Sequence, residues 1–97
     1  MLTDQQAIEI AFAYIAEHEL VEPGVRVATK PEWILRQPGA VLIGYNSSEF
    51  LATEDPMVGL LGNMPIRVDD TTGTCRELSM DEYLEQYEAN LPSPHQD

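Results

Sequence analysis

Basic residues are scarce in this chain. Its 97 residues include five Lys and Arg against 17 Asp and Glu, which gives a formal net charge of −12. A protein that binds nucleic acid needs a basic surface to contact the phosphates, and attraction to an anionic membrane needs the same sign of charge. We therefore expect neither nucleic acid nor a membrane as a partner. A protein with a basic surface would instead be attracted.

Cysteine, histidine and long apolar runs are also lacking. Cys75 is the only cysteine and there are two histidines, so the sequence offers no disulfide within the chain and no zinc-binding motif. No apolar run approaches the ~20 residues of a membrane-spanning helix. No basic segment followed by an apolar stretch marks a secretory signal. The simplest expectation is a cytoplasmic protein without cofactors.

A chain of this length, 43% hydrophobic, forms a single small domain. We expect the domain to span residues 1–91. Residues 92–97 are predicted to form a flexible tail, because the two prolines among them cannot continue a helix.

Two helices are predicted, one near each end. Thr3 and Gln6 have the spacing of a capping box, and apolar residues at helical spacing follow them, which predicts a helix over residues 4–20. A second capping box at Ser79 and Glu82 predicts a short helix over residues 80–89. The apolar stripe expected to face inward in this second helix consists of Tyr83, Leu84 and Tyr87.

The middle of the chain predicts an antiparallel sheet. Apolar runs and alternation indicate strands at residues 25–30, 33–36, 41–45, 65–69 and 74–78. The run 41–45 is apolar on both faces, as in a central strand. A short strand or turn is expected near Phe50-Leu51. The order predicts an α+β fold with an N-terminal helix, an antiparallel sheet of four to five strands and a short C-terminal helix.

Candidate catalytic groups are few. Cys75 and His18 form a nucleophile–base pair only if the fold brings them together, and a lone cysteine in a strand is more often a small packed apolar residue. The acid pairs Asp69-Asp70 and Glu54-Asp55 lie beside turn residues, where Asp usually bonds its own backbone. We therefore predict that the protein is not an enzyme. A small hydrolase that uses these groups is kept as an alternative.

The glycine-containing segment 59–63 is not a phosphate-binding loop. It lacks the Lys and Ser/Thr of that motif, and it precedes a strand rather than a helix. We expect Gly62 and Asn63 to take unusual backbone angles that turn the chain into the next strand.

Acidic charge is concentrated at the two ends of the sequence. Residues 1–22 carry five acids and residues 77–97 carry six, with no base in either segment. Asp81, Glu85 and Glu88 fall on one helical face, where like charges repel. Glu17 and Glu19 lie at the unfavourable C-terminal end of the first helix. Such local conflict favours a functional surface, while the alternative is an ordinary solvated face.

The segment from Gly62 to Gly73, together with the Glu82-Tyr83-Leu84 helix, resembles the immunity protein 35 family, which includes YrhB-like small bacterial proteins. The resemblance extends to the amphipathic helix over residues 6–18 and the apolar strand 42–47. It implies a cytoplasmic bacterial protein of a polymorphic toxin system that binds a cognate toxin and blocks it without catalysis. Chaperone-like activity, linked to YrhB-like members, implies the alternative of a holdase that binds unfolded clients.

Under this hypothesis the partner is a toxin protein with a basic surface. Acidic side chains would accelerate association, and apolar or loop residues would anchor the partner. The sequence is also compatible with a homodimer. The candidate partner-binding residues are Glu17, Glu19, Trp33, Phe50, Met57, Asn63, Met64, Asp81, Glu85 and Glu88.

Overall fold

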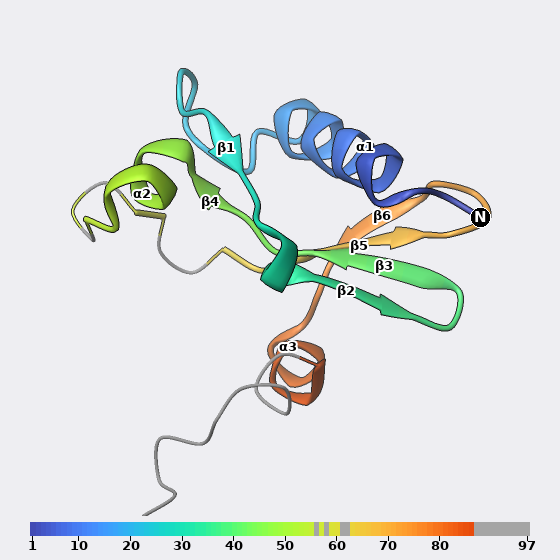
Figure 1. The fold of residues 1–97 in the computed structure, drawn as a ribbon. Helices are drawn as coiled ribbons and strands as arrows, with labels where there is room; N and C mark the ends of the chain where they lie inside the picture. The colour runs from blue at the N-terminus through green and yellow to red at the C-terminus, as the bar shows by residue number, and fades with distance from the viewer. Residues whose placement is uncertain (56, 58, 61–62, 87–97) are drawn as a thin grey trace, which may run out of the picture.

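A computed structural model provides the fold and describes residues 1–55, 57, 59–60 and 63–86. It has an N-terminal helix, antiparallel sheets of two and four strands, and a short C-terminal helix. The predicted α+β class is therefore confirmed (Figure 1). The predicted end of the domain at residue 91 and the predicted tail 92–97 lie outside the described residues.

The N-terminal helix, α1, spans Asp4–Glu17 and begins with the predicted capping box. The Thr3 hydroxyl accepts a hydrogen bond from the Gln6 N–H (3.1 Å), and the Gln6 side chain accepts one from the Thr3 N–H (2.9 Å). Two donors at the helix start are thereby satisfied.

The helix ends earlier than the sequence suggests. The N–H of Glu19 donates to the Ala16 carbonyl (3.3 Å), and the N–H of Leu20 donates to the Ile15 carbonyl (3.0 Å). This pair of bonds is a Schellman motif, which places Glu19 in the left-handed region at φ 52. This end could not be predicted, because glycine usually occupies that position and Glu19 stands there instead.

Four strands form the main sheet. Their spatial order is β2-β3-β5-β6, and neighbouring strands are antiparallel. The predicted strands of this sheet are confirmed and differ only at their ends. Their bounds are Ile34–Gln37 for β2, Ala40–Ile43 for β3, Ile66–Asp69 for β5 and Cys75–Glu77 for β6. Glycines with positive φ close two of the turns, Gly39 at φ 81 and Gly73 at φ 76.

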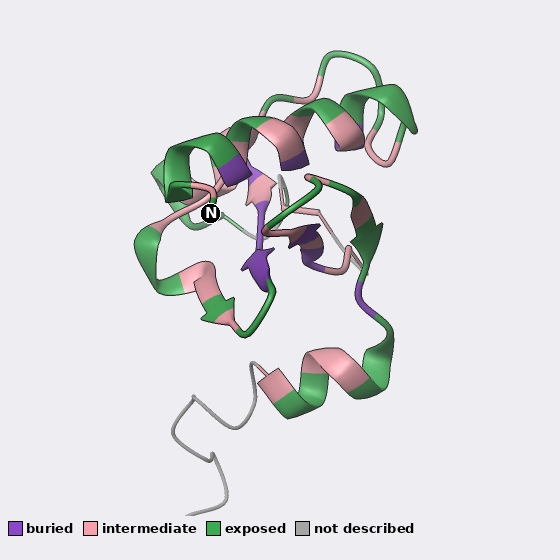
Figure 2. Cartoon of the chain, turned by 90° about the vertical axis from the view of Figure 1, so that its right-hand side faces the viewer, coloured by how far each residue is buried: buried purple, intermediate pink, exposed green. Residues whose placement is uncertain are grey.

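One face of this sheet packs against α1. Small residues on the helix allow a close approach, and branched side chains on β3 and β5 fill the layer between. Figure 2 shows buried positions on the side of α1 that faces the strands. Each large side chain buried there stabilises the fold by roughly 1.5–3 kcal/mol. The buried residues of this layer are Ala7, Ala11, Ile15, Val41, Ile43, Tyr45, Ile66 and Val68.

Among the described residues, fewer pack on the opposite face of the sheet. Leu42 and Leu78 are buried there, with Leu35 and Tyr83 packed on them. The strand register also brings Arg67 to this face, since Arg67 pairs with Leu42 on one side. Arg67 therefore points away from Ile66 and Val68.

The C-terminal helix, α3, spans Met80–Gln86 on this second face (Figure 1). None of these seven residues is buried. Tyr83 is the residue that packs on the sheet cluster, whereas Leu84 is 43% exposed. The prediction that Leu84 belongs to the inward stripe is therefore wrong, because so short a helix turns only a narrow face to the sheet. Tyr87 lies outside the described residues.

Two interactions at its first turn fix α3. The Ser79 hydroxyl accepts the Glu82 N–H (3.2 Å) while the Glu82 carboxylate accepts the Ser79 N–H (3.0 Å), so the second capping box is confirmed. Arg76 on β6 donates two hydrogen bonds to the same carboxylate, at 2.8 and 2.7 Å. These contacts lower the pKa of Glu82 to about 2, and the hydrogen bonds from Arg76 contribute most.

A smaller unit extends from one end of the sheet. Strands β1 (Val27–Ala28) and β4 (Asn46–Ser47) pair, and helix α2 (Ser48–Thr53) follows β4 directly. Two corrections arise. The strand predicted over residues 25–30 is shortened, because Pro31 starts the 3₁₀ helix η1 (Pro31–Trp33). The short strand or turn predicted near Phe50-Leu51 is instead helical, because the Ser47 hydroxyl caps α2 by accepting the Phe50 N–H at 3.1 Å.

Candidate functional site

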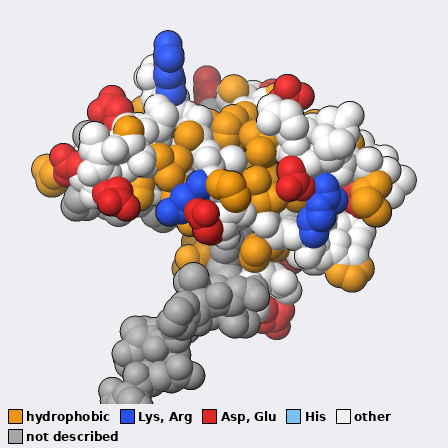
Figure 3. Space-filling model, viewed as in Figure 1, with side chains coloured by type: hydrophobic (Ala, Val, Ile, Leu, Met, Phe, Trp, Pro, Cys, Tyr) orange, Lys and Arg blue, Asp and Glu red, His pale blue; other side chains and the backbone are white. Residues whose placement is uncertain are grey.

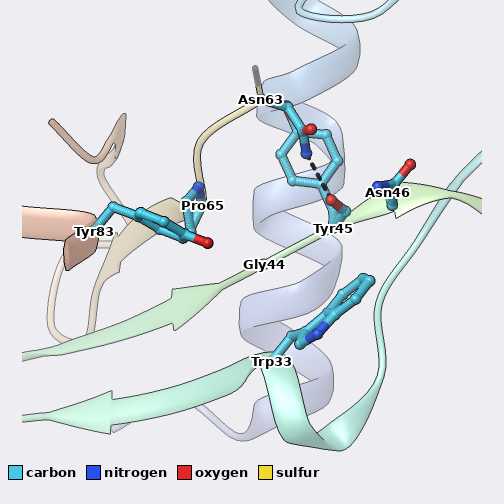
Figure 4. A pocket seen from close by; sticks show the side chains of 7 residues that line it. All are labelled: Trp33, Gly44, Tyr45, Asn46, Asn63, Pro65 and Tyr83. Atoms are coloured by element: carbon cyan, nitrogen blue, oxygen red, sulfur yellow. Dashed lines mark hydrogen bonds between the residues drawn. The ribbon is translucent and has the colours of Figure 1, made fainter. Parts of the chain in front are cut away.

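The described part of the chain forms an open hollow of about 210 Å³ where β3 leaves the main sheet. Trp33 and Tyr83 approach it from opposite sides of Gly44 (Figure 4). Four segments that are distant in the sequence converge here: η1, the β3–β4 connection, the entry to β5, and α3. The lining residues are Trp33, Gly44, Tyr45, Asn46, Asn63, Pro65 and Tyr83.

Trp33 is held in place through its backbone and its ring. Its carbonyl accepts the N–H of Gly44 (3.1 Å), which ties η1 to the end of β3. The Nζ atom of Lys30 lies 4.6 Å from the centroid of the Trp33 ring, within the range of a cation–π interaction. One side of the indole is thus used within the protein, while the residue also lines the hollow.

The two asparagines of the hollow are fixed by hydrogen bonds to backbone. Nδ2 of Asn63 donates to the carbonyl of Tyr45 (2.6 Å). Oδ1 of Asn46 accepts the N–H of Leu60 and the N–H of Ser47, both at 2.7 Å. Asn63 therefore shapes the entry to β5 through its side chain. The expected unusual backbone angle at Asn63 is wrong, since its φ is not positive, and Gly62 lies outside the described residues.

The seven lining residues carry no formal charge at neutral pH. Tyr45 stays protonated there, because burial, and to a lesser extent the charge of Glu77, raises the pKa of its phenol. Acidic side chains lie outside the hollow. Asp81 and Glu85 are exposed on α3, the helix that supplies Tyr83.

The predicted acidic residues do not form one surface. Glu17 and Glu19 lie at the end of α1, and Asp81 and Glu85 lie on α3, on the other side of the sheet (Figure 1). Glu88 lies outside the described residues. Further acidic side chains gather on the face that Figure 3 shows, over the α2 end of the molecule. The exposed acids of that end are Glu49, Glu54 and Asp55.

Of the predicted anchor residues, the structure brings Trp33 and Asn63 together at the hollow. Met64 follows Asn63 in the chain and is half-buried. Phe50 belongs to α2, and its ring lies so close to Gly59 that an added Cβ there would stand 3.0 Å from it. Met57 is 88% exposed beyond α2. Neither Phe50 nor Met57 lines the hollow.

Five lining residues were not among the sequence candidates for partner binding. One of them, Tyr45, was predicted as the end of the apolar strand 41–45. Gly44, Asn46 and Pro65 are small or polar positions at strand ends, which carry no pattern of their own. Tyr83 was assigned to the core stripe of a helix. The shortness of the helix could have pointed to Tyr83, because a large aromatic side chain on a short, poorly buried helix often keeps one edge exposed.

The groups considered for catalysis have local roles. Cys75 packs against the core beneath α1, and burial raises the pKa of its thiol. His18 lies against the Tyr14 ring, with 4.3 Å between centroids. The carboxylate of Asp69 accepts the N–H groups of Thr71 and Thr72, both at 2.8 Å, which lowers the pKa of Asp69.

The Asp70 carboxylate, likewise, accepts the N–H of Leu2 (2.8 Å), and that of Asp55 accepts the N–H of Met57 (2.9 Å). Among the residues described, no group of three or more His, Cys, Asp or Glu is placed to hold a metal ion. Within the same ranges no helix is both long and apolar enough to cross a bilayer.

Comparison of the chain with protein-family models, with curated proteins and with solved structures found no match.

Proposed function

We propose that this chain is a bacterial immunity protein that works in the cytoplasm by binding a cognate toxin and covering its active surface, with no catalysis of its own. One observation carries the proposal: Trp33 and Tyr83 flank a hollow whose other lining groups are small or hydrogen-bonding. Trp and Tyr are enriched among residues that dominate binding energy at protein interfaces. The resemblance of the segment 62–73 to the immunity protein 35 family points in the same direction.

The size of the hollow favours a protein ligand. Pockets for drug-sized ligands and cofactors measure about 300–1,000 Å³, whereas this hollow measures about 210 Å³. It suits one inserted side chain, which is how an interface anchor is usually received.

The charge of the molecule favours a basic partner. A net charge of −12 attracts a cationic surface and accelerates its association. Asp81 and Glu85 lie on the helix that borders the hollow, so a basic partner would be drawn toward the same side of the protein. Exposed charges of this kind raise the association rate more than they raise affinity.

The direct experiment mixes the protein with the toxin encoded beside it. We expect a complex at low salt that weakens as salt is added. Trp33→Ala should cost about 2 kcal/mol of binding free energy, roughly 30-fold in Kd. Phe50→Ala is the matched control, because it removes a half-buried aromatic ring that does not line the hollow. Failure to co-elute at low salt, or an equal loss in both variants, would refute the proposal.

A second candidate function is a holdase for unfolded proteins. The observation in its favour is an exposed apolar pair one helical turn apart on α3, with Met80 56% and Leu84 43% exposed. A holdase would suppress aggregation of several unrelated clients. Strict preference for one partner would exclude it.

A further inference from the structure

The hydrogen bonds of the two asparagines fix which way each amide faces. Asn63 donates its nitrogen to a carbonyl oxygen, so Oδ1 is left as an acceptor. Asn46 accepts two backbone N–H groups through its oxygen, so Nδ2 is left as a donor. An amide flip at either position would set two donors or two acceptors against each other.

Neither of these two atoms has a partner within the described residues. No donor bonds to Oδ1 of Asn63 there, and no acceptor bonds to Nδ2 of Asn46. Both side chains line the hollow, and Figure 4 shows the Asn46 oxygen pointing away from Tyr45. The hollow therefore presents one fixed acceptor and one fixed donor to whatever enters it.

The same lining disfavours a charged group. None of the seven lining residues is ionised at neutral pH. A charged group that enters the hollow would therefore lose part of its hydration without gaining a counter-charge from the lining. The ammonium group of Lys30 lies over the Trp33 ring and would repel a cation that enters the hollow. The acidic residues of α3 guide a basic partner from outside the hollow and do not line it.

A purely apolar group is also disfavoured. It would cover Oδ1 of Asn63 and Nδ2 of Asn46 without replacing their bonds to water, and each unsatisfied polar atom costs binding energy. A planar group that both accepts and donates satisfies both atoms and lies well between the Trp33 and Tyr83 side chains. The primary amide of Gln or Asn has this chemistry, and a hollow of about 210 Å³ can admit such a side chain.

We propose that the hollow recognises a single uncharged side-chain amide, Gln or Asn, inserted by the partner. This inference rests on the proposed function, since it identifies the residue type with which the toxin engages the hollow. It assigns the acceptor role to Asn63 and the donor role to Asn46.

Blocked tripeptides test the chemistry without any toxin. The probes are Ac-Gly-Gln-Gly-NH₂ and the equivalents with Glu, Lys or Leu in the centre. Trp33 is the only tryptophan, so its indole N–H gives a single NMR signal that reports on the hollow. We expect a saturable shift with the Gln peptide, and binding about fivefold to tenfold weaker for the Leu peptide, the cost of a neutral hydrogen bond. Equal or tighter binding of the Lys, Glu or Leu peptide, or no response to any peptide, would overturn the inference.

Asn46→Asp is the decisive variant. A carboxylate keeps the oxygen that accepts the N–H groups of Ser47 and Leu60, so the local fold is retained, while the donor is lost and a negative charge is added. The preference should change from the Gln peptide to the Lys peptide. Gln5→Glu is the matched control, because it makes the same change of charge at an exposed position on α1 and should leave the preference unaltered. An unchanged preference in Asn46→Asp would contradict the inference.

The two proposals fail separately. If the toxin binds and Trp33→Ala weakens it while the peptides show no amide preference, the inference falls and the proposed function stands. If the Gln peptide binds selectively but no toxin does, the hollow serves a different partner and the proposed function falls.

Discussion

Glu19 illustrates a residue in a conformation that its side chain disfavours. It occupies the position of the α1 Schellman motif where glycine is usual, at φ 52. A left-handed conformation costs roughly 1–2 kcal/mol for residues other than glycine. Glu19→Gly should therefore raise the free energy of unfolding by up to about 1 kcal/mol.

Glu17→Gly supplies the matched comparison. Glu17 is the last residue of α1 and has a helical backbone, so glycine there should lower stability by about 0.5–1 kcal/mol. Urea denaturation of both variants measures the two changes. Effects of the same sign would contradict the strain assigned to Glu19.

The ion pair of Glu82 with Arg76 predicts a pH dependence. The pKa of Glu82 falls from its ordinary value of 4.5 to about 2 in the folded protein. A carboxylate with a depressed folded pKa stabilises the fold fully above the unfolded pKa, and that stabilisation disappears as pH falls from 4.5 toward 2. The stability advantage of the wild type over Glu82→Gln should therefore be constant near neutral pH and shrink within this window.

Denaturation at a series of pH values measures this advantage. Asp81→Asn is the control, because Asp81 is the neighbouring acid on α3 and forms no ion pair within the described residues. If the advantage over Glu82→Gln persisted unchanged down to pH 2, the contact with Arg76 would not contribute to folding.

At the scale of elements, the fit of α1 on the sheet depends on two alanines. Ala7 and Ala11 are fully buried beneath the helix. Ala11→Leu would overfill this layer and should destabilise the fold by about 1–3 kcal/mol. Ala13→Leu adds the same atoms on the exposed side of α1 and should change stability by less than about 0.5 kcal/mol. Thermal denaturation compares the two, and equal effects would contradict the described contact.

Elements with strong local signals could be predicted from the sequence. Both capping boxes, the doubly buried β3 and the turn at Gly73 follow from residue type and spacing. Helix α2 could not be predicted in this way, because its cap at Ser47 lacks the Glu or Gln of a capping box and the helix has only six residues.

The hollow was even harder to predict from the sequence than helix α2. Trp33 and Asn63 were candidates because of residue type, but their convergence depends on how η1 and α3 pack on opposite sides of Gly44. Packing between segments distant in the sequence leaves no periodic pattern. For the same reason, the sequence suggested one acidic surface where the structure has several.

At the scale of the whole molecule, the acidic residues lie on different sides of the sheet, so they should differ in their effect on the association rate. Asp81 and Glu85 share the side of the hollow, whereas Glu17 and Glu19 lie across the sheet from α3. Because electrostatic screening acts over about 10 Å at 0.1 M salt, the nearer pair should dominate association with a basic toxin.

Double charge reversal tests this difference. Asp81→Lys with Glu85→Lys should slow association with the proposed toxin at 0.1 M salt by about tenfold. Glu17→Lys with Glu19→Lys alters the net charge equally and should slow association much less. Stopped-flow kinetics measures both rates. Equal slowing would show that only the total charge matters.

The arginine on the second face of the sheet also has a consequence for folding. A slip of one residue between β3 and β5 would move each side chain of β5 to the other face of the sheet. The guanidinium of Arg67 would then lie in the hydrophobic layer under α1, among Ala7, Ala11 and Ile15. Burying an unpaired cation among hydrocarbon side chains costs free energy. Arg67 therefore favours the observed register of β3 and β5 over this misaligned pairing.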